Sequence, residues 1–327
     1  MTAKDVAAHA GVSIATISMV ANGKAQGRVS PSTQIRVENA IKELGYVVNS
    51  AARSLVTGRN GRIALLANDI TNPFIVSIAK GVNEVLGADT RLVLSESGPL
   101  SPVDIASMGV DAMIVDLADA NIEIIVGAGL PVVILDEPDL PATLARVYFD
   151  LEHGSRELAE HLVQLGHRII VYLDSGRART SFDIRRTHLS REFRRLAGKG
   201  SKVIRAHSDL DIQAAERAVR NGIDRWLHQG ATAIVTATDI QAYGVLGALH
   251  SRGITVPDEV SVASYDNNAF SRVVGPPLTT VNLPARDLGR QSAMLLTEQV
   301  SRGSNTARTV ILPTTLIVRS STGKANR

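Results

Sequence analysis

Short apolar segments alternate with helical stretches from residue 62 to residue 300, and this alternation limits the fold more than any other feature. Strands that alternate with helices form parallel sheets whose two faces are covered by helices. The expected strands are Arg62–Ala67, Arg91–Leu94, Asp111–Leu117, Pro131–Leu135, Arg146–Phe149, Arg168–Leu173, Lys202–Arg205, Ala231–Thr236 and Val260–Tyr265. The expected helices include Phe74–Leu86, Gly154–Leu165, Gln213–His228, Ile240–Ser251 and Arg286–Val300. The sequence therefore predicts an α/β core made of two doubly wound parallel sheets.

The first sixty residues predict three short helices instead. Lys4–His9 reads as a helix that Gly11 ends, since the residue after a helix often needs a positive φ. Ser13 can cap a second helix, Ile14–Ala21, and Ser30 can cap a third helix with Pro31 in its first turn. The expected apolar stripe of the third helix is Ile35, Val37, Ala40, Ile41 and Leu44. A tight glycine turn between the first two helices is the layout of a helix-turn-helix.

Charge supports a nucleic-acid partner for this segment. Residues 1–60 hold seven Lys and Arg against three acids, a net charge of +4, whereas the remaining chain holds 28 against 29. In the second predicted helix Val12, Ile17 and Val20 can face inward, which leaves small and hydroxyl side chains outside. Such side chains let a helix enter the major groove and reach phosphates. DNA binding is therefore favoured over a helical bundle that serves only for packing.

Residues 4–58 resemble the DNA-binding headpiece of the lac repressor (LacI) family, through the stretches DVAAHAGVS, ATIS, VANG, RVS, AIKELGYVVN and AARSL. The resemblance implies that Ile14, Ala15 and Met19 face the bases. It implies backbone contacts from Ser13, Thr16, Ser18, Asn22 and Arg28. Asn49 would cap a hinge helix in which Leu55, beside Arg53, wedges into the minor groove. The chain departs from the family at Met19, where arginine is usual, and at Val48, where proline is usual.

The resemblance continues to the C-terminus through NDITNPF, LVQLGHRIIVYL, TATDIQAYGVLGAL, GITVPDEVSVASYDN, PPLTTVNLP and LPTTLIVRSST. It implies a periplasmic-binding-protein-like core, with two subdomains, three crossovers and a ligand cleft between them. The implied domains are residues 1–47 (helix-turn-helix), 48–60 (hinge), 61–149 with 282–312 (first subdomain), and 150–281 with 313–327 (second subdomain). The segment between Leu94 and Asp111 is shorter than usual, so a truncated helix is expected there.

Carried over residue by residue, the resemblance gives an effector site at strand ends, where α/β sheets bind ligands. The implied residues are Asp69, Phe74, Asp116, Asp139, Phe149, Ser181, Arg185, Thr238 and Asp266, with Ser181 and Arg185 expected just before a helix. Carboxylates accept hydrogen bonds from hydroxyls and a guanidinium donates a fork of them, so these residues suit a sugar or sugar-like effector. Seven arginines between residues 177 and 195 leave an anionic effector, such as a sugar phosphate, open.

Several classes of protein are disfavoured. The chain has no cysteine, which excludes disulfides and fits a reducing cytoplasm, and it has no Walker loop, GxGxxG, GxSxG or HExxH. No apolar run approaches the length of a membrane span, and the N-terminus lacks the apolar region of a secretory signal. We therefore expect neither an enzyme, nor a cofactor, nor a metal site, and we expect a cytoplasmic protein associated with the nucleoid.

The sequence predicts a ligand-responsive transcriptional regulator, with repression as the commoner outcome in the family it resembles. It would bind a pseudo-palindromic operator as a homodimer, because a two-fold protein matches a two-fold site. Two alternatives stay open: a secreted-type sugar-binding protein without gene regulation, and a DNA-binding regulator with no effector.

Overall fold

The computed structural model describes residues 1–21, 23, 25–46, 59–96, 98, 100–116, 122–140, 143–175, 180–303 and 307–326. It divides into two compact units, Met1–Gly61 and Arg62–Arg327. The predicted DNA contacts Asn22, Asn49, Arg53 and Leu55, and the departure at Val48, lie outside the described residues.

The N-terminal unit contains three helices, as the capping residues predict: α1 (Ala3–Ala10), α2 (Ile14–Ala21) and α3 (Pro31–Glu43). Gly11 follows α1 with a φ of 64°, which a glycine adopts without steric cost. The Ser13 hydroxyl accepts a hydrogen bond from the Thr16 amide at 3.1 Å, and the Ser30 hydroxyl accepts one from the Thr33 amide at 3.3 Å. These caps fix where α2 and α3 begin.

A small apolar core holds the three helices together. Val6 from α1, Ile17 from α2 and Val37 from α3 are all buried in it. Ile35 is a correction to the predicted stripe of α3, because 59% of its surface is exposed. Val37 and Ala40 are three residues apart and fill the buried face, whereas Ile35 lies off that face.

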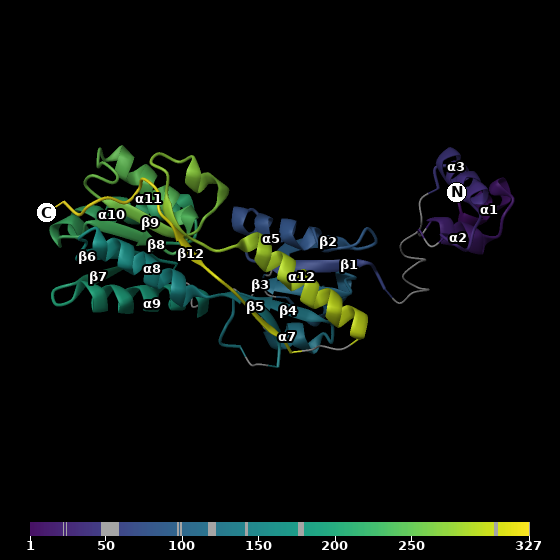
Figure 1. The fold of residues 1–327 in the computed structure, drawn as a ribbon, viewed down its shortest axis with the longest axis horizontal. Helices are drawn as coiled ribbons and strands as arrows, with labels where there is room; N and C mark the ends of the chain where they lie inside the picture. Colours follow the sequence, from purple (N-terminus) through teal and green to yellow (C-terminus); the bar gives the residue numbers. More distant parts are fainter. Residues whose placement is uncertain are drawn as a thin grey trace. The chain divides into compact units, whose positions relative to one another are not determined.

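The larger unit contains two six-stranded sheets (Figure 1). The first has the order β11-β5-β4-β3-β1-β2, and every pair in it is parallel. Its strands are β1 (Arg62–Ala67), β2 (Arg91–Glu96), β3 (Ala112–Asp116), β4 (Val132–Leu135), β5 (Ala145–Phe149) and β11 (Thr309–Leu312). Its helices are α5 (Pro73–Asn83), α6 (Pro102–Ser107), α7 (Ile122–Gly127) and α12 (Ala285–Arg302). We call this sheet with these helices the first lobe.

The second sheet has the order β12-β10-β9-β8-β6-β7, in which only the pair β10–β12 is antiparallel. Its strands are β6 (Ile169–Asp174), β7 (Lys202–His207), β8 (Ala233–Thr236), β9 (Ser261–Asp266), β10 (Thr279–Asn282) and β12 (Thr315–Ile317). Its helices are α8 (Leu151–Gln164), α9 (Thr180–Ala197), α10 (Ile212–His228), α11 (Asp239–Ser251) and the 3₁₀ turn η1 (Ala269–Arg272). This sheet and its helices form the second lobe.

The inner strands β1, β3, β4, β6, β8, β9 and β10 are buried along almost their whole length, as helices on both sides of a parallel sheet require, whereas the edge strands β2, β7, β11 and β12 are partly exposed. In β1, Ile63 and Leu65 join the core that contains α5 and α12, while Ala64 and Leu66 join the core that contains α6 and α7. The helices α5 and α12 lie side by side (Figure 1) and approach closely at glycines. A Cβ added at Gly81 would lie 1.9 Å from the Arg286 carbonyl oxygen, so only glycine fits there.

The sequence pattern missed the three strands β10, β11 and β12, each of four residues or fewer, and the six-residue helix α7. Elements this short contain too few residues to show a period of 2 or 3.6. The chain moves between the lobes after β5, after β10 and after β11, which gives the three expected crossovers. The short α6 occupies the segment where a truncated helix was expected.

Among the described residues, no helix is both long and apolar enough to cross a membrane.

Candidate DNA-binding surface and effector cleft

The helix α2 presents the side chains that the sequence assigns to DNA. Ser13, Ile14, Ala15 and Ser18 are exposed, with Ile14 at 53%, and Thr16 and Met19 are partly exposed. Ile17 alone is fully buried, so the helix packs through one side and leaves the other open. An exposed apolar residue on a short helix suits contact with a thymine methyl group.

Cations flank α2 rather than lie on it. Arg28 is exposed in the turn before α3, and Lys4 and Arg36 are exposed on α1 and α3. Phosphate contacts position a protein on DNA, whereas base contacts select the sequence. We therefore predict that the helix supplies shape and that the flanking residues supply attraction to the DNA backbone.

The second candidate site is a cavity of about 250 Å³ between the two lobes. Its lining comes from the ends of strands in both sheets and from the N-terminal ends of α5, α9 and α11. Ligands of α/β proteins commonly bind at this edge of the sheet. The lining residues are Asn68, Asp69, Asn72, Phe74, Ile75, Ile78, Asp116, Leu135, Asp136, Ser181, Phe182, Arg185, Asp209, Leu210, Asp211, Thr238, Asp266 and Leu288.

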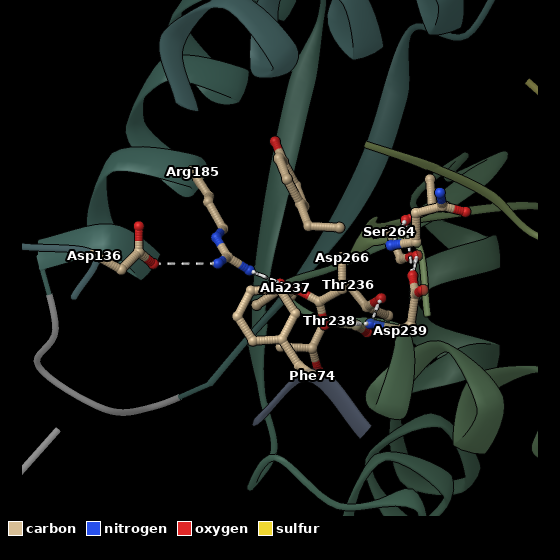
Figure 2. Close-up of polar contacts among 12 residues, drawn as sticks. Phe74, Asp136, Arg185, Thr236, Ala237, Thr238, Asp239, Ser264 and Asp266 are labelled. Carbon is tan, nitrogen blue, oxygen red and sulfur yellow. Dashed lines mark hydrogen bonds and ion pairs between the residues drawn. The ribbon is translucent and has the colours of Figure 1, made fainter. Parts of the chain in front are cut away.

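Arg185 lines this cavity, and Figure 2 shows its guanidinium between Asp136 and Ala237. Its Nη1 donates to the Ala237 carbonyl at 2.8 Å and lies 3.3 Å from the Asp266 carboxylate, while its Nη2 lies 3.6 Å from Asp136. The guanidinium also stacks over the rings of Phe182 and Tyr265, at 5.0 and 5.5 Å. Such stacking restricts the orientation of the planar guanidinium group. The Nε atom of Arg185 is buried and has no hydrogen-bond partner among the described residues.

Burial sets the electrostatics of the neighbouring carboxyl groups. Desolvation raises the pKa of Asp266 well above its usual value, and the nearby Arg185 opposes that rise. Asp239, at the start of α11, also has a raised pKa because it is buried, and four hydrogen bonds oppose the rise. It accepts from the hydroxyls of Ser264, Ser271 and Thr280 and from the Asn268 amide.

Asp239 in turn supports the site. Its backbone N–H donates to the other oxygen of Asp266 at 3.4 Å. The network thus joins the start of α11 to the ends of β9 and β10, and it places Asp266 where Arg185 can reach it (Figure 2). Asp266 itself has a φ of 118°, so the backbone turns sharply at the end of β9.

The structure brings seven of the nine predicted effector residues to the cavity: Asp69, Phe74, Asp116, Ser181, Arg185, Thr238 and Asp266. Asp139 is exposed outside the lining. Phe149 is buried behind the cavity, where its ring packs edge-on against Phe74 at 6.1 Å. Ser181 and Arg185 correct the expectation that they precede a helix, since both lie within the first two turns of α9. Their assignment to effector binding stays a prediction.

Three aspartates of the lining were missed. Asp136 directly follows β4, and so meets the strand-end criterion that selected Asp116. Asp209 and Asp211 lie in the loop after β7, the edge strand of its sheet, and the sequence pattern did not indicate a ligand site there. Asp211 caps α10 by accepting from the Ala214 amide at 2.7 Å, so its position has a local structural cause.

The arginines of α9 do not make the cavity basic. Arg185 alone among the described ones lines it, against six aspartates. Arg186 pairs with Asp174 and Asp183, Arg191 pairs with Glu152 and Glu192, and Arg195 pairs with Glu192. Arg177 and Arg179 lie outside the described residues. No group of three or more possible metal ligands occurs in the part of the chain that the structure describes.

Comparison with known proteins relates two regions of the chain to known families. Residues 2–49 match the family described as bacterial regulatory proteins, lacI family, and residues 159–322 match the periplasmic binding protein-like domain. The transcriptional regulator DegA of Bacillus subtilis is 31% identical, over 99% of each chain.

Two solved structures are similar over almost the whole length. The lac repressor dimer bound to operator and the anti-inducer ONPF has a TM-score of 0.81 at 26% identity, over 99% of each chain. The complex of the transcriptional regulator CelR with cellobiose has a TM-score of 0.71 at 28% identity, over 98% of this chain and 99% of that one. With a helix-turn-helix in front of a two-lobed core and this similarity from end to end, the chain belongs to the lacI family of bacterial regulatory proteins, which bind DNA and regulate transcription.

Proposed function

We propose that the protein is a cytoplasmic repressor that binds a pseudo-palindromic operator as a homodimer and responds to a neutral sugar in the cleft between its lobes. The observation that carries this proposal is the cavity, in which one arginine fork, several carboxylates, hydroxyls and an aromatic ring converge. Carboxylates accept hydrogen bonds from sugar hydroxyls, and the Phe74 ring offers a face to a sugar ring.

Charge favours a neutral ligand over an anionic one. Six aspartates against one arginine would repel a phosphate or a second carboxylate, and Arg185 already has acidic partners. CelR, with cellobiose bound, and the lac repressor, with the anti-inducer ONPF bound, are the related structures that support a sugar-like effector. The cavity volume is at the small end of ligand sites, which favours a compact molecule.

The proposed mechanism is a shift between two states. An effector changes operator affinity only if it binds the DNA-competent and the DNA-incompetent states unequally. The dimer is supported by the lac repressor dimer on its operator. Recognition and response through binding alone need no catalytic step, so we propose that the protein is not an enzyme.

The test is a selection of genomic fragments by the full-length protein, followed by binding measurements with a panel of neutral sugars and their phosphates. We expect a palindromic fragment to bind at least ~10³-fold more tightly than random DNA, and one neutral sugar to change that affinity by at least ~5-fold. Equal binding to all fragments would refute the regulator. Selective DNA binding that no panel member alters would favour a regulator without an effector, and a response to the phosphates alone would refute a neutral ligand.

Removal of Arg28 is expected to weaken binding to all DNA sequences by a similar factor. The residue is exposed beside α3, and a phosphate contact carries no sequence information. Each lost phosphate contact lowers the slope of log K against log salt by roughly 0.9. Binding of Arg28→Ala to operator and to random DNA, measured between low and high salt, checks this. An unchanged slope would remove Arg28 from the interface, and Arg252→Ala, on the larger unit, is the control.

A further inference from the structure

One ion pair spans the cleft of this structure. Arg185 belongs to α9 of the second lobe, and its Nη2 lies 3.6 Å from the carboxylate of Asp136, which follows β4 of the first lobe. The same guanidinium is held within its own lobe by the Ala237 carbonyl and by Asp266. A single side chain therefore contacts both lobes (Figure 2).

Both partners are withdrawn from water. The side chain of Arg185 is 3% exposed and that of Asp136 is 11% exposed, so solvent screens their attraction weakly. Removal of one partner from such a pair leaves the other charge uncompensated, which makes buried pairs far more sensitive to mutation than surface pairs. The ring contacts to Phe182 and Tyr265 restrict the guanidinium, so it does not simply follow Asp136 when the lobes move apart.

The backbone also commits Asp136 to this position. Its φ is 54°, in the left-handed region that side chains other than glycine, asparagine and aspartate seldom adopt. The turn between β4 and β5 thus directs the Asp136 carboxylate toward the second lobe, at some cost in backbone conformational energy.

We propose that Asp136 is a positioning residue that fastens the two lobes together through Arg185 when the cleft holds no effector. An effector that accepts hydrogen bonds from the Arg185 guanidinium must then displace the Asp136 carboxylate or bind to both groups. The ligand-free distance between the lobes is set by this pair, whatever the identity of the effector. The inference concerns the unliganded protein, so it can fail while the proposed response to a sugar holds, and the reverse is also possible.

The absence of cysteine from the chain allows a direct measurement. Ala106 on α6 and Gln213 on α10 are exposed, one on each lobe, and both can be changed to cysteine and labelled with a dye pair. Energy transfer in the full-length protein, with labelled chains diluted into unlabelled protein, reports the distance between the lobes. It is measured without DNA or sugar.

The variants are chosen to fold. Asparagine and glycine both accept the positive φ of Asp136, so Asp136→Asn and Asp136→Gly remove the charge without adding backbone strain. Asp139→Asn is the matched control, because it makes the same change three residues away, at an exposed position outside the cavity lining. Circular dichroism confirms that each variant is folded before the distance is measured.

We expect both Asp136 variants to lengthen the mean distance between the dyes by roughly 2 Å or more, the scale of hinge movements, and to broaden its distribution. Asp139→Asn is expected to match the parent protein. A distance that stays unchanged in folded Asp136→Asn and Asp136→Gly, or that changes equally in Asp139→Asn, would overturn the proposal.

Discussion

Replacement of Asp239 by alanine is expected to lower the free energy of unfolding by about 3–5 kcal/mol, the largest effect on stability that we predict. The carboxyl group is fully buried and accepts hydrogen bonds from three hydroxyls and one amide. Without it these donors stay buried with no acceptor, and each unmet donor costs ~1–3 kcal/mol, partly relieved where a hydroxyl can rotate. Denaturant unfolding followed by circular dichroism measures the loss.

Two further variants separate this explanation from a general effect of mutation. Asp239→Asn keeps one acceptor oxygen and the shape of the side chain, so it should be less damaging than alanine. Asp258→Ala removes an exposed aspartate of the same lobe and should change stability by less than about 0.5 kcal/mol. Stability of Asp239→Ala equal to that of Asp258→Ala would show that the network contributes little.

Replacement of Arg185 by alanine is expected to weaken effector binding by roughly 100-fold or more, the largest effect on function that we predict. The guanidinium is the one cation among the described lining residues. Its loss removes the fork and leaves Asp266 buried beside an empty space. The measurement is calorimetric titration with the sugar that gives the largest response in the panel.

Arg186→Ala is the matched control for this prediction. Arg186 is the next residue along the same helix, but it pairs with Asp174 and Asp183 and does not line the cavity. We expect it to keep effector affinity within a few-fold of the parent protein. The opposite pattern, with affinity lost in Arg186→Ala and kept in Arg185→Ala, would show that the wrong arginine has been assigned. Circular dichroism serves as the check on folding in both variants.

Much of the fold follows from local pattern. All nine strands that the sequence predicts are present, each within two residues of its predicted ends, as with β1 and β6. The capping residues Ser13 and Ser30 also predicted where two helices begin, because a cap is a contact between residues three apart. The polar strand β10 was missed because β9 and β12 define it by pairing, at residues far away in the chain.

The candidate cleft was only partly predictable. Strand ends indicated Asp116 and Asp266, since the carboxyl ends of parallel strands meet at one edge of a sheet. The same rule would have found Asp136, but it could not show that Asp136 lies opposite Arg185. It also selected Asp139, three residues farther on, where the chain has already turned away from the cavity.

The helix-turn-helix, the alternation of the longer helices and strands, and the family can all be read from local sequence, because these features depend on residues close together in the chain. Which charges meet depends instead on how distant segments fold together. Arg185, Asp136 and Asp266 come from three separate segments, and burial sets the strength of their interaction. Sequence spacing records neither distance across a cleft nor exclusion of water, and these two quantities govern the electrostatics of the site.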